Sequence, residues 1–245
     1  MKLSVIICTS GRPESLKKAL QSLKQQSFED FETLIMRESP LVKARDLGWR
    51  KAKGEIVAWI DDDVILDKDW AKNLTAIFQD HPEAGGVSGP TIVAENLLKN
   101  RLVFWWYGKK SWLAKLWVRL VLDKQPFRVG KITKIGWWSP GSNFKQCLKL
   151  KGLQKIDYLE ACNMSLRRKL VEQVGGFDLG FKGTGEWCEP DLALRIKRLG
   201  FSLAWSREVK VEHHVSRMGA FVKRRNWPER IMNYLKFRRK WLKFQ

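Results

Sequence analysis

The chain has 245 residues, 44% of them apolar, so it can form one globular domain with a substantial core. Its formal net charge is +20. No apolar run approaches the roughly 18 residues that cross a bilayer, and the run at residues 3–8 is too short for a signal peptide. The four cysteines lack zinc-type spacing and CxxC pairs, which is typical of a reducing compartment. We therefore expect a cytoplasmic protein, peripherally associated with the cytoplasmic face of a membrane.

The positive charge is concentrated in two segments. Residues 97–155 contain 14 Lys and Arg against 1 acidic residue, with six of the thirteen tryptophans, and residues 216–245 contain 10 against 1. The rest of the chain is close to neutral. We therefore expect one domain over 1–215, with 97–155 as a basic, tryptophan-rich insert, and a basic amphipathic segment over 216–245.

The first third of the chain alternates between short apolar runs and amphipathic stretches. Apolar runs predict strands, and helical spacing of apolar residues predicts helices. The expected order is a strand at 3–9, a helix from Pro13, a strand at 31–36, a helix at 42–52 and a strand at 56–60. This β-α-β-α-β order predicts an α/β fold with a doubly wound, mostly parallel sheet and helices on both faces.

The rest of the body continues the alternation less regularly. A helix is expected at 69–79, a strand at 86–93, regular structure at 156–167, a short helix at 169–174, a helix that starts with Pro190 at its first position and ends at Gly200, and a strand at 201–211.

Three consecutive carboxylates, Asp61 to Asp63, follow the apolar run Ile56–Ile60. Like charges this close destabilise one another unless a cation or hydrogen-bond donors compensate. Hard oxygen ligands suit Mg2+ or Mn2+, and ligands bind at the carboxyl end of strands in open α/β sheets. Taken alone, the triplet is equally typical of an acidic turn that caps the next helix.

Four blocks of the chain follow one another in order: SVIICTSGRPESLKKALQSL, KARDLGWRKAKGEIVAWIDDDV, ACNMSLRRKLVEQVGGFD and GEWCEPDLALRIKRLGF. Together they resemble the family 2 glycosyltransferases with the GT-A fold. The second block matches the family's Ala-Arg, Gly-Glu and DxD pattern, and the third matches its Gly-Gly-Phe-Asp block. These two carry the strongest signals.

The resemblance implies a site for a nucleotide sugar and a metal. Asp61 and Asp63 match the DxD pair, with Asp63 the better candidate for the metal and Asp62 or Asp61 nearer the ribose or sugar. His213 or His214 would complete the metal or diphosphate site. Residues in the nucleotide-contacting positions are Thr9, Arg12 and Arg45, and Glu38 stands near the place of an aspartate that this chain lacks.

The resemblance also implies a catalytic base for the acceptor hydroxyl. Aligning Asp191-Leu192 with the family's Asp-Leu places Glu189 in that role, although Cys188-Glu189 replaces the usual Glu-Asp. Glu186 is the alternative base. Asp191 is expected to orient the loop or the acceptor.

The predicted function is metal-dependent transfer of a sugar from a nucleotide-diphosphate sugar to a saccharide hydroxyl or a polyprenyl-linked phosphate. Inversion is implied by the family. One alternative is a sugar-phosphate nucleotidyltransferase, which needs a glycine-rich, arginine-containing loop that residues 9–13 match poorly. The other is a non-catalytic basic module that binds membrane or nucleic acid, and nucleic acid is disfavoured because no DNA- or RNA-binding module is visible.

Two basic amphipathic helices are expected to contact an anionic membrane. One carries Leu113, Leu116, Trp117, Leu120 and Val121 on one face. The second carries Ile231, Tyr234, Leu235, Trp241 and Leu242. Tryptophan and tyrosine favour the membrane interface, and Lys and Arg favour anionic lipid. The alternative is that both helices pack on the body or on a second subunit.

Overall fold

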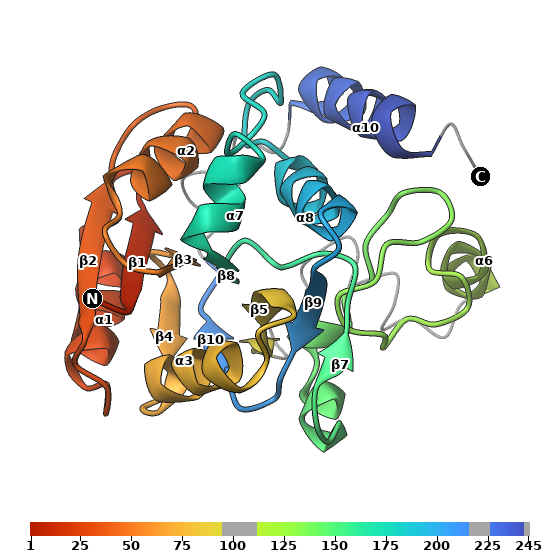
Figure 1. Ribbon diagram of the computed structural model, residues 1–245. Helices are drawn as coiled ribbons and strands as arrows, with labels where there is room; N and C mark the ends of the chain where they lie inside the picture. The colour runs from red at the N-terminus through yellow and green to blue at the C-terminus, as the bar shows by residue number, and fades with distance from the viewer. Residues whose placement is uncertain (95–111, 216–225, 243–245) are drawn as a thin grey trace.

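The structure is a computed structural model that describes residues 1–94, 112–215 and 226–242 (Figure 1). Its main sheet has seven strands in the order β2-β1-β3-β8-β5-β9-β7. Their bounds are β1 Leu3–Cys8, β2 Phe31–Met36, β3 Ile56–Asp61, β5 Ala84–Ser88, β7 Gln154–Lys155, β8 Asn163–Arg167 and β9 Ser202–Trp205.

Five of these strands run in one direction. β1 is parallel to β2 and β3, β8 runs antiparallel between β3 and β5, and β9 is parallel to β5 and antiparallel to β7. The prediction of a mostly parallel α/β sheet is confirmed. Cys8 pairs with Met36 on one side and with Asp61 on the other. The carboxyl ends of the first three strands therefore meet at one edge, where the acidic turn begins.

A small second sheet with the order β4-β10-β6 lies beside the main one. It consists of β4 Val64–Leu66, β6 Thr91–Val93 and β10 Val211–His213. β10 is antiparallel to β4, and its His213 pairs with Val64. Because Val64 follows the acidic turn directly, this pairing brings a histidine from far along the chain next to Asp63.

The predictions of single strands at 86–93 and 201–211 are wrong, because each region contains two strands in different sheets. Gly89 breaks the first region, and a Cβ at this position would lie 2.0 Å from the carbonyl oxygen of Val209 in the second break. Asn163 Nδ2 donates to the carbonyl oxygens of Pro90, at 3.3 Å, and Val209, at 2.7 Å. One buried amide thus holds both breaks together.

Helices cover both faces of the main sheet. α1 Pro13–Lys24 and α3 Trp70–Asp80 pack on the face that carries Val5 and Ile7. α2 Leu41–Lys51, α7 Arg168–Gln173 and α8 Cys188–Arg198 pack on the opposite face. The alternation along β1 separates the two cores, since successive side chains of a strand point to opposite faces.

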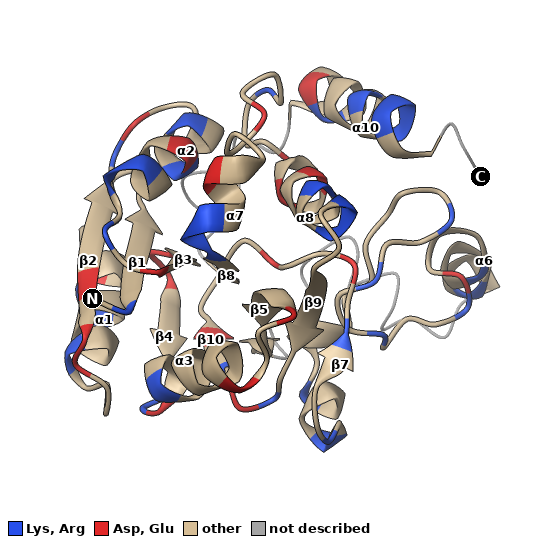
Figure 2. Cartoon of the chain, viewed as in Figure 1, with Lys and Arg blue, Asp and Glu red and all other residues tan. Residues whose placement is uncertain are grey.

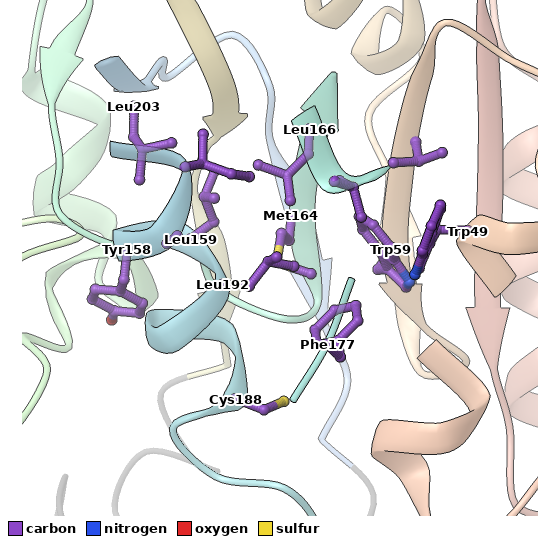
Figure 3. Packing of buried hydrophobic residues seen from close by; sticks show 14 of the residues in the cluster. Trp49, Trp59, Tyr158, Leu159, Met164, Leu166, Phe177, Cys188, Leu192 and Leu203 are labelled. Carbon is purple, nitrogen blue, oxygen red and sulfur yellow. The ribbon is translucent and has the colours of Figure 1, made fainter. Parts of the chain in front are cut away.

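The core under α2, α7 and α8 reaches the carboxyl edge of the sheet (Figure 3). Trp59 of β3 meets Phe177 edge to face at 5.4 Å, and its indole nitrogen donates to the carbonyl oxygen of Arg45 at 3.1 Å. Met164 of β8 and Leu192 of α8 belong to the same cluster. This packing fixes α2 and α8, which both carry predicted site residues.

Two further predictions need correction around α8. Regular structure over 156–167 is limited to β8, and residues 156–162 form a loop. α8 begins at Cys188, so Pro190 is its third residue and not its first. Trp187 is the residue before the helix and has a left-handed backbone, with φ of 71°.

The C-terminal helix α10, Trp227–Trp241, packs on the body beside α8 (Figure 1). Its own residues Asn233 and Phe237 are fully buried against the body. Tyr234 OH of the same helix donates to the carbonyl oxygen of Ile135 at 2.6 Å. The apolar face of this helix, which was predicted to contact a membrane, is therefore only partly exposed. Tyr234 and Trp241 face the body, whereas Ile231 and Leu235 remain exposed.

The helix predicted near residue 113 is confirmed as α6, Trp112–Val121. Figure 2 shows Lys and Arg on α6 and along much of α10. The predictions that concern residues 95–111, including Trp105 and Trp106, and residues 216–225 and 243–245 lie outside the described residues. Within the described ranges, no helix is both long and apolar enough to span a bilayer.

Candidate active site

The acidic turn after β3 is neutralised in part by Arg12. Arg12 lies at the start of α1, forms an ion pair with Asp62, and donates to Asp63 Oδ2 at 2.6 Å. Thr9 Oγ1 donates to Asp62 Oδ2 at 2.5 Å. Burial raises the pKa of Asp62, and the Thr9 hydrogen bond and Arg12 oppose that increase. The predicted residues Thr9 and Arg12 thus hold the turn that carries the aspartates.

Asp61, Asp63 and His213 form a cluster suited to a divalent metal. One potential ligand atom from each lies within 4.8 Å of those of the other two. His213 Nε2 is 3.2 Å from Asp63 Oδ1. Two carboxylates and an imidazole are a ligand set that fits Mn2+, and carboxylates with water also suit Mg2+. The donor set therefore fits the predicted metal.

Two predicted residues lie away from this cluster. The His214 side chain is 62% exposed and pairs with Glu212 at 3.9 Å, although the His214 backbone NH donates to the Asp63 carbonyl oxygen at 2.8 Å. Successive residues of an extended chain face opposite sides, so only one histidine of the pair can face the cluster. Glu38 accepts from the Arg37 backbone NH at 3.0 Å and does not line the cavity described next.

A cavity of about 190 Å³, called the central pocket below, joins the cluster to the loop before α8. It includes a run of consecutive residues from Tyr158 to Cys162. Its lining is Arg45, Asp61, Trp138, Asn143, Tyr158, Leu159, Glu160, Ala161, Cys162, Thr184, Glu186, Trp187, Glu189, Pro190, His213 and Arg230. Asp61 and His213 of the metal-type cluster and both candidate bases thus line one cavity, whereas Asp63 does not line it and contacts His213 instead.

Glu189 forms an ion pair with Arg45 in the wall of the central pocket. Arg45 is 4% exposed and also lies 3.6 Å from Cys188 Sγ. Burial by itself would lower the pKa of Arg45, but the Glu189 carboxylate reverses the effect and the pKa is raised. The ion pair with Arg45 therefore fixes the orientation of the Glu189 side chain.

Glu186 lies in the same wall and is held by two groups. Thr184 Oγ1 donates to Glu186 Oε2 at 2.6 Å, and Arg230 Nε lies 3.2 Å from Glu186 Oε1. Arg230 belongs to α10, so the C-terminal helix contributes a side chain to the pocket. No sequence motif indicates this contribution, because residues 216–245 were predicted as a separate amphipathic segment.

The loop that carries Glu186 and Glu189 has a constrained backbone. Trp187 adopts its left-handed conformation while its indole nitrogen donates to the Gly136 carbonyl oxygen at 3.0 Å. The indole packs against Trp138 at 5.0 Å and Tyr234 at 5.3 Å. Trp138 comes from the predicted basic insert, and it forms part of the pocket wall.

Asp191 does not line the central pocket, which argues against its predicted role in orienting the acceptor. It is fully buried on the far side of α8, where Arg195 Nε donates at 3.0 Å and Trp241 Nε1 at 2.8 Å. Lys240 Nζ lies 2.7 Å from the same carboxylate. Asp191 therefore joins α8 to the end of α10.

Glu160 is a pocket carboxylate that the sequence prediction missed. It precedes the Ala161-Cys162-Asn163 block, and its surroundings come from segments far apart in the chain. Thr91 Oγ1 donates to Glu160 Oε2 at 3.0 Å and Asn143 Nδ2 donates at 3.2 Å. Burial raises the pKa of Glu160. A glutamate in a loop gave no sequence signal for this position.

The mostly parallel sheet with helices on both faces, and the acidic turn at the carboxyl edge of that sheet, are features of glycosyltransferases with the GT-A fold. A family model described as glycosyl transferase family 2 matches residues 37–175. The chain belongs to this family. The match includes Arg45, the aspartates and Glu160, whereas Glu186, Glu189, His213 and Arg230 lie beyond it.

Known proteins extend the resemblance at low identity. The chain is 23% identical over 248 residues to a glucosyl-dolichyl phosphate glucuronosyltransferase from Haloferax volcanii, covering 87% of the chain and 69% of that protein. The structure of GalNAc-T7 with UDP, GalNAc and Mn2+ matches 100% of the chain with a TM-score of 0.66 at 13% identity, and the chain covers 48% of it.

The mannosyltransferase PcManGT from Pyrobaculum calidifontis, solved with GDP-Man and Mn2+, matches 98% of the chain at 14% identity with a TM-score of 0.60. The chain covers 63% of that structure. It thus spans about half to two thirds of the length of these two structures, and the likeness concerns the fold.

Proposed function

We propose that this protein transfers a sugar from a nucleotide-diphosphate sugar to an acceptor by direct displacement, with inversion at the anomeric carbon, in a metal-dependent reaction. The observation that carries the proposal is the central pocket, in which Asp61 and His213 of the metal-type cluster line the same cavity as Glu189. A leaving diphosphate needs a cation, and an attacking hydroxyl needs a base.

At the donor end, Asp61, Asp63 and His213 would hold Mn2+ or Mg2+, which when bound supplies Lewis-acid stabilisation of the leaving diphosphate. Arg12 and Thr9 keep the acidic turn in place through Asp62 and Asp63. Asp62 is fully buried by these contacts, so its role in this proposal is to position the turn.

At the acceptor end, Glu189 accepts the proton of the attacking hydroxyl. Its ion pair with Arg45 holds the carboxylate in the wall of the pocket, and a base has to be held within reach of the proton that it accepts. Glu186 is the alternative base, because it lines the same cavity and accepts from Thr184. Substitutions of the two glutamates are expected to change kcat to different extents.

The acceptor in this proposal is a saccharide hydroxyl or a lipid-linked phosphate. The relative from Haloferax volcanii, whose name includes dolichyl phosphate, supports the lipid-linked class. Arg230 adds a cation to the pocket, and arginine suits phosphate recognition because its planar donors match phosphate oxygens.

We infer that α6 places the enzyme on an anionic membrane surface. Its outer face exposes apolar side chains, with Trp112 71% exposed, Leu120 59%, Leu116 43% and Leu113 41%. Lys115 and Arg119 are exposed on the same helix, and the surrounding segment 97–155 is strongly basic. Apolar insertion together with basic side chains favours an anionic bilayer. Such a surface would bring a lipid-linked acceptor to the pocket.

The experiment is a donor panel with purified protein and Mn2+ or Mg2+, in which binding is followed by thermal shift and products are identified by mass spectrometry. Transfer with release of a nucleoside diphosphate supports the proposal, and Asp63→Ala is expected to abolish transfer. Release of pyrophosphate from a nucleoside triphosphate and a sugar phosphate would instead identify a nucleotidyltransferase. If no nucleotide sugar binds with either metal, the proposal fails.

A further inference from the structure

Glu160 is held in the central pocket by three segments that meet there. Thr91 comes from β6, Asn143 from the short helix η1 at Gly141–Asn143, and Tyr158 from the loop before β8. Asn143 Nδ2 also donates to Thr91 Oγ1 at 2.5 Å, so the two donors support each other. A carboxylate held this way keeps one orientation.

The hydrogen bonds divide unequally between the two oxygens of Glu160. Oε2 accepts from Thr91 and Asn143, at 3.0 and 3.2 Å. Oε1 has the Tyr158 hydroxyl at 3.5 Å, but Tyr158 lies closer to the Ser139 carbonyl oxygen, at 3.1 Å. A phenol has one proton, and each carboxylate oxygen can accept about two hydrogen bonds. Oε1 therefore has capacity for a hydroxyl donor from a ligand.

The other two glutamates of the pocket differ from Glu160 in their partners. Glu189 pairs with Arg45 and Glu186 pairs with Arg230, so each has a cation beside it. The hydrogen bonds that the structure gives Glu160 come from a hydroxyl, an amide and a phenol. These donors are neutral, and the charged group that acts on Glu160 is His213 of the metal-type cluster. Among the described residues no Lys or Arg forms an ion pair with Glu160, so a second negative group beside it would be repelled.

We propose that Glu160 binds a hydroxyl group of the transferred sugar and thereby selects a neutral sugar over a uronic acid. The inference rests on the proposed function and specifies its donor class. With the diphosphate at the metal-type cluster and the base at Glu189, the sugar ring occupies the cavity between them, and Glu160 lines that cavity. A site built to accept from a hydroxyl rejects a ligand that offers a carboxylate instead.

The test compares matched donors that differ in oxidation at C6. Free UDP, GDP, CDP and dTDP first identify the nucleobase by thermal shift with Mn2+. The wild-type protein is then assayed with the corresponding neutral sugar and uronic acid, such as UDP-glucose and UDP-glucuronate or GDP-mannose and GDP-mannuronate. We expect kcat/KM to favour the neutral donor by about tenfold to a hundredfold, the range of one hydrogen bond to a charged group.

The variant Glu160→Gln removes the charge and keeps the size of the side chain. We expect it to lose about tenfold or more in kcat/KM for the neutral donor and to reduce the preference over the uronic donor. Its affinity for the free nucleoside diphosphate with Mn2+ is expected to stay at the wild-type value. Glu172→Gln, at an exposed position of α7, serves as the matched control and should change neither quantity.

The outcomes separate this inference from the proposed function. If wild-type protein uses no donor at all, the proposed function fails. If it prefers the uronic donor, or if Glu160→Gln leaves the preference unchanged, Glu160 does not select the sugar and the inference is overturned. The wild-type comparison decides the matter even if the variant does not fold. Loss of nucleoside diphosphate binding in a folded Glu160→Gln protein would also contradict it, because the residue would then act on the diphosphate site.

Discussion

Arg12 donates a 2.6 Å hydrogen bond to one oxygen of Asp63, and the other oxygen of that carboxylate lies 3.2 Å from His213 Nε2. The two oxygens of Asp63 thus have different partners. The sequence suggested that a bound metal, and not the excess of Lys and Arg, compensates the three aspartates. In the structure Arg12 compensates Asp62 and one side of Asp63, and the metal-type cluster uses the other side.

The adjacent histidines provide a matched pair of variants. His213→Ala removes a predicted metal ligand, so we expect the concentration of Mn2+ needed for half-maximal activation to rise by about tenfold or more. His214→Ala changes an exposed side chain and should leave that concentration unchanged. Mn2+ titration of both variants checks this. An equal effect of the two substitutions would argue against a metal at this cluster.

The two pocket glutamates are expected to differ in catalysis. Glu189→Gln keeps the shape of the side chain but cannot accept a proton, so kcat should fall by about a hundredfold or more while donor affinity is retained. Glu186→Gln keeps the contact with Thr184 and is expected to affect kcat less. Single-turnover transfer and nucleotide binding measure the two quantities. Retained transfer in Glu189→Gln, with loss in Glu186→Gln, would move the base to Glu186.

Asp191 is expected to support stability more than chemistry. Asp191→Asn leaves Lys240 and Arg195 without their carboxylate, and one third of the Lys240 side chain is exposed and can be hydrated. We expect a loss of about 2–3 kcal/mol in the free energy of unfolding. Thermal denaturation should show a Tm lower by roughly 4–10 °C. At a temperature where the variant is folded, the KM for the donor should match wild type, and a selective change in it would return Asp191 to the site.

The strands and helices of the first third could be predicted from sequence because each is a local pattern. β1, β2 and β3 are continuous apolar runs, and α1 has a proline at its start. The break of 86–93 into two strands depends on contact between Gly89 and Val209, which is 120 residues away in sequence and has no local signal.

The site likewise contains residues that a local sequence pattern predicts and residues that only long-range packing brings there. Asp61 and Asp63 follow a strand and match a motif, so their position was predictable. Arg230 and Glu160 reach the central pocket through tertiary packing of α10 and of the loop before β8, and neither belongs to a local pattern. Packing of α10 on the body was one of the alternatives that the sequence left open, because helical periodicity gives an apolar stripe but does not say what covers it.

The buried thiol of Cys8 predicts a loss of stability at alkaline pH. Burial raises its pKa from the ordinary 9.0 to about 12, and Arg45 opposes the shift. The unfolded chain loses this proton above pH 9, whereas the folded protein keeps it up to about pH 12. The contribution is therefore complete below pH 9 and is lost as pH rises, by about 1.4 kcal/mol per pH unit.

Urea unfolding of wild type and Cys8→Ala across this alkaline range measures that contribution. Other groups titrate in the same range, so the difference between the two slopes is the informative quantity. The wild-type slope should be steeper by about 1 kcal/mol per pH unit. Equal slopes would show that the thiol ionises in the folded protein much as it does in the unfolded chain.

The exposed face of α6 predicts binding to anionic vesicles. Replacing Leu116 and Leu120 together by Asp puts two charges where apolar side chains would enter the interface, and each buried leucine contributes about 1.5–3 kcal/mol. We expect flotation with phosphatidylglycerol vesicles to fall by about tenfold or more, with the fold unchanged because both side chains are exposed. Leu179→Asp, at an exposed leucine outside α6, is the matched control. Wild-type protein that binds no vesicles would favour a protein partner for this face. Equal binding to neutral and anionic vesicles would instead show that the basic side chains contribute nothing to lipid binding.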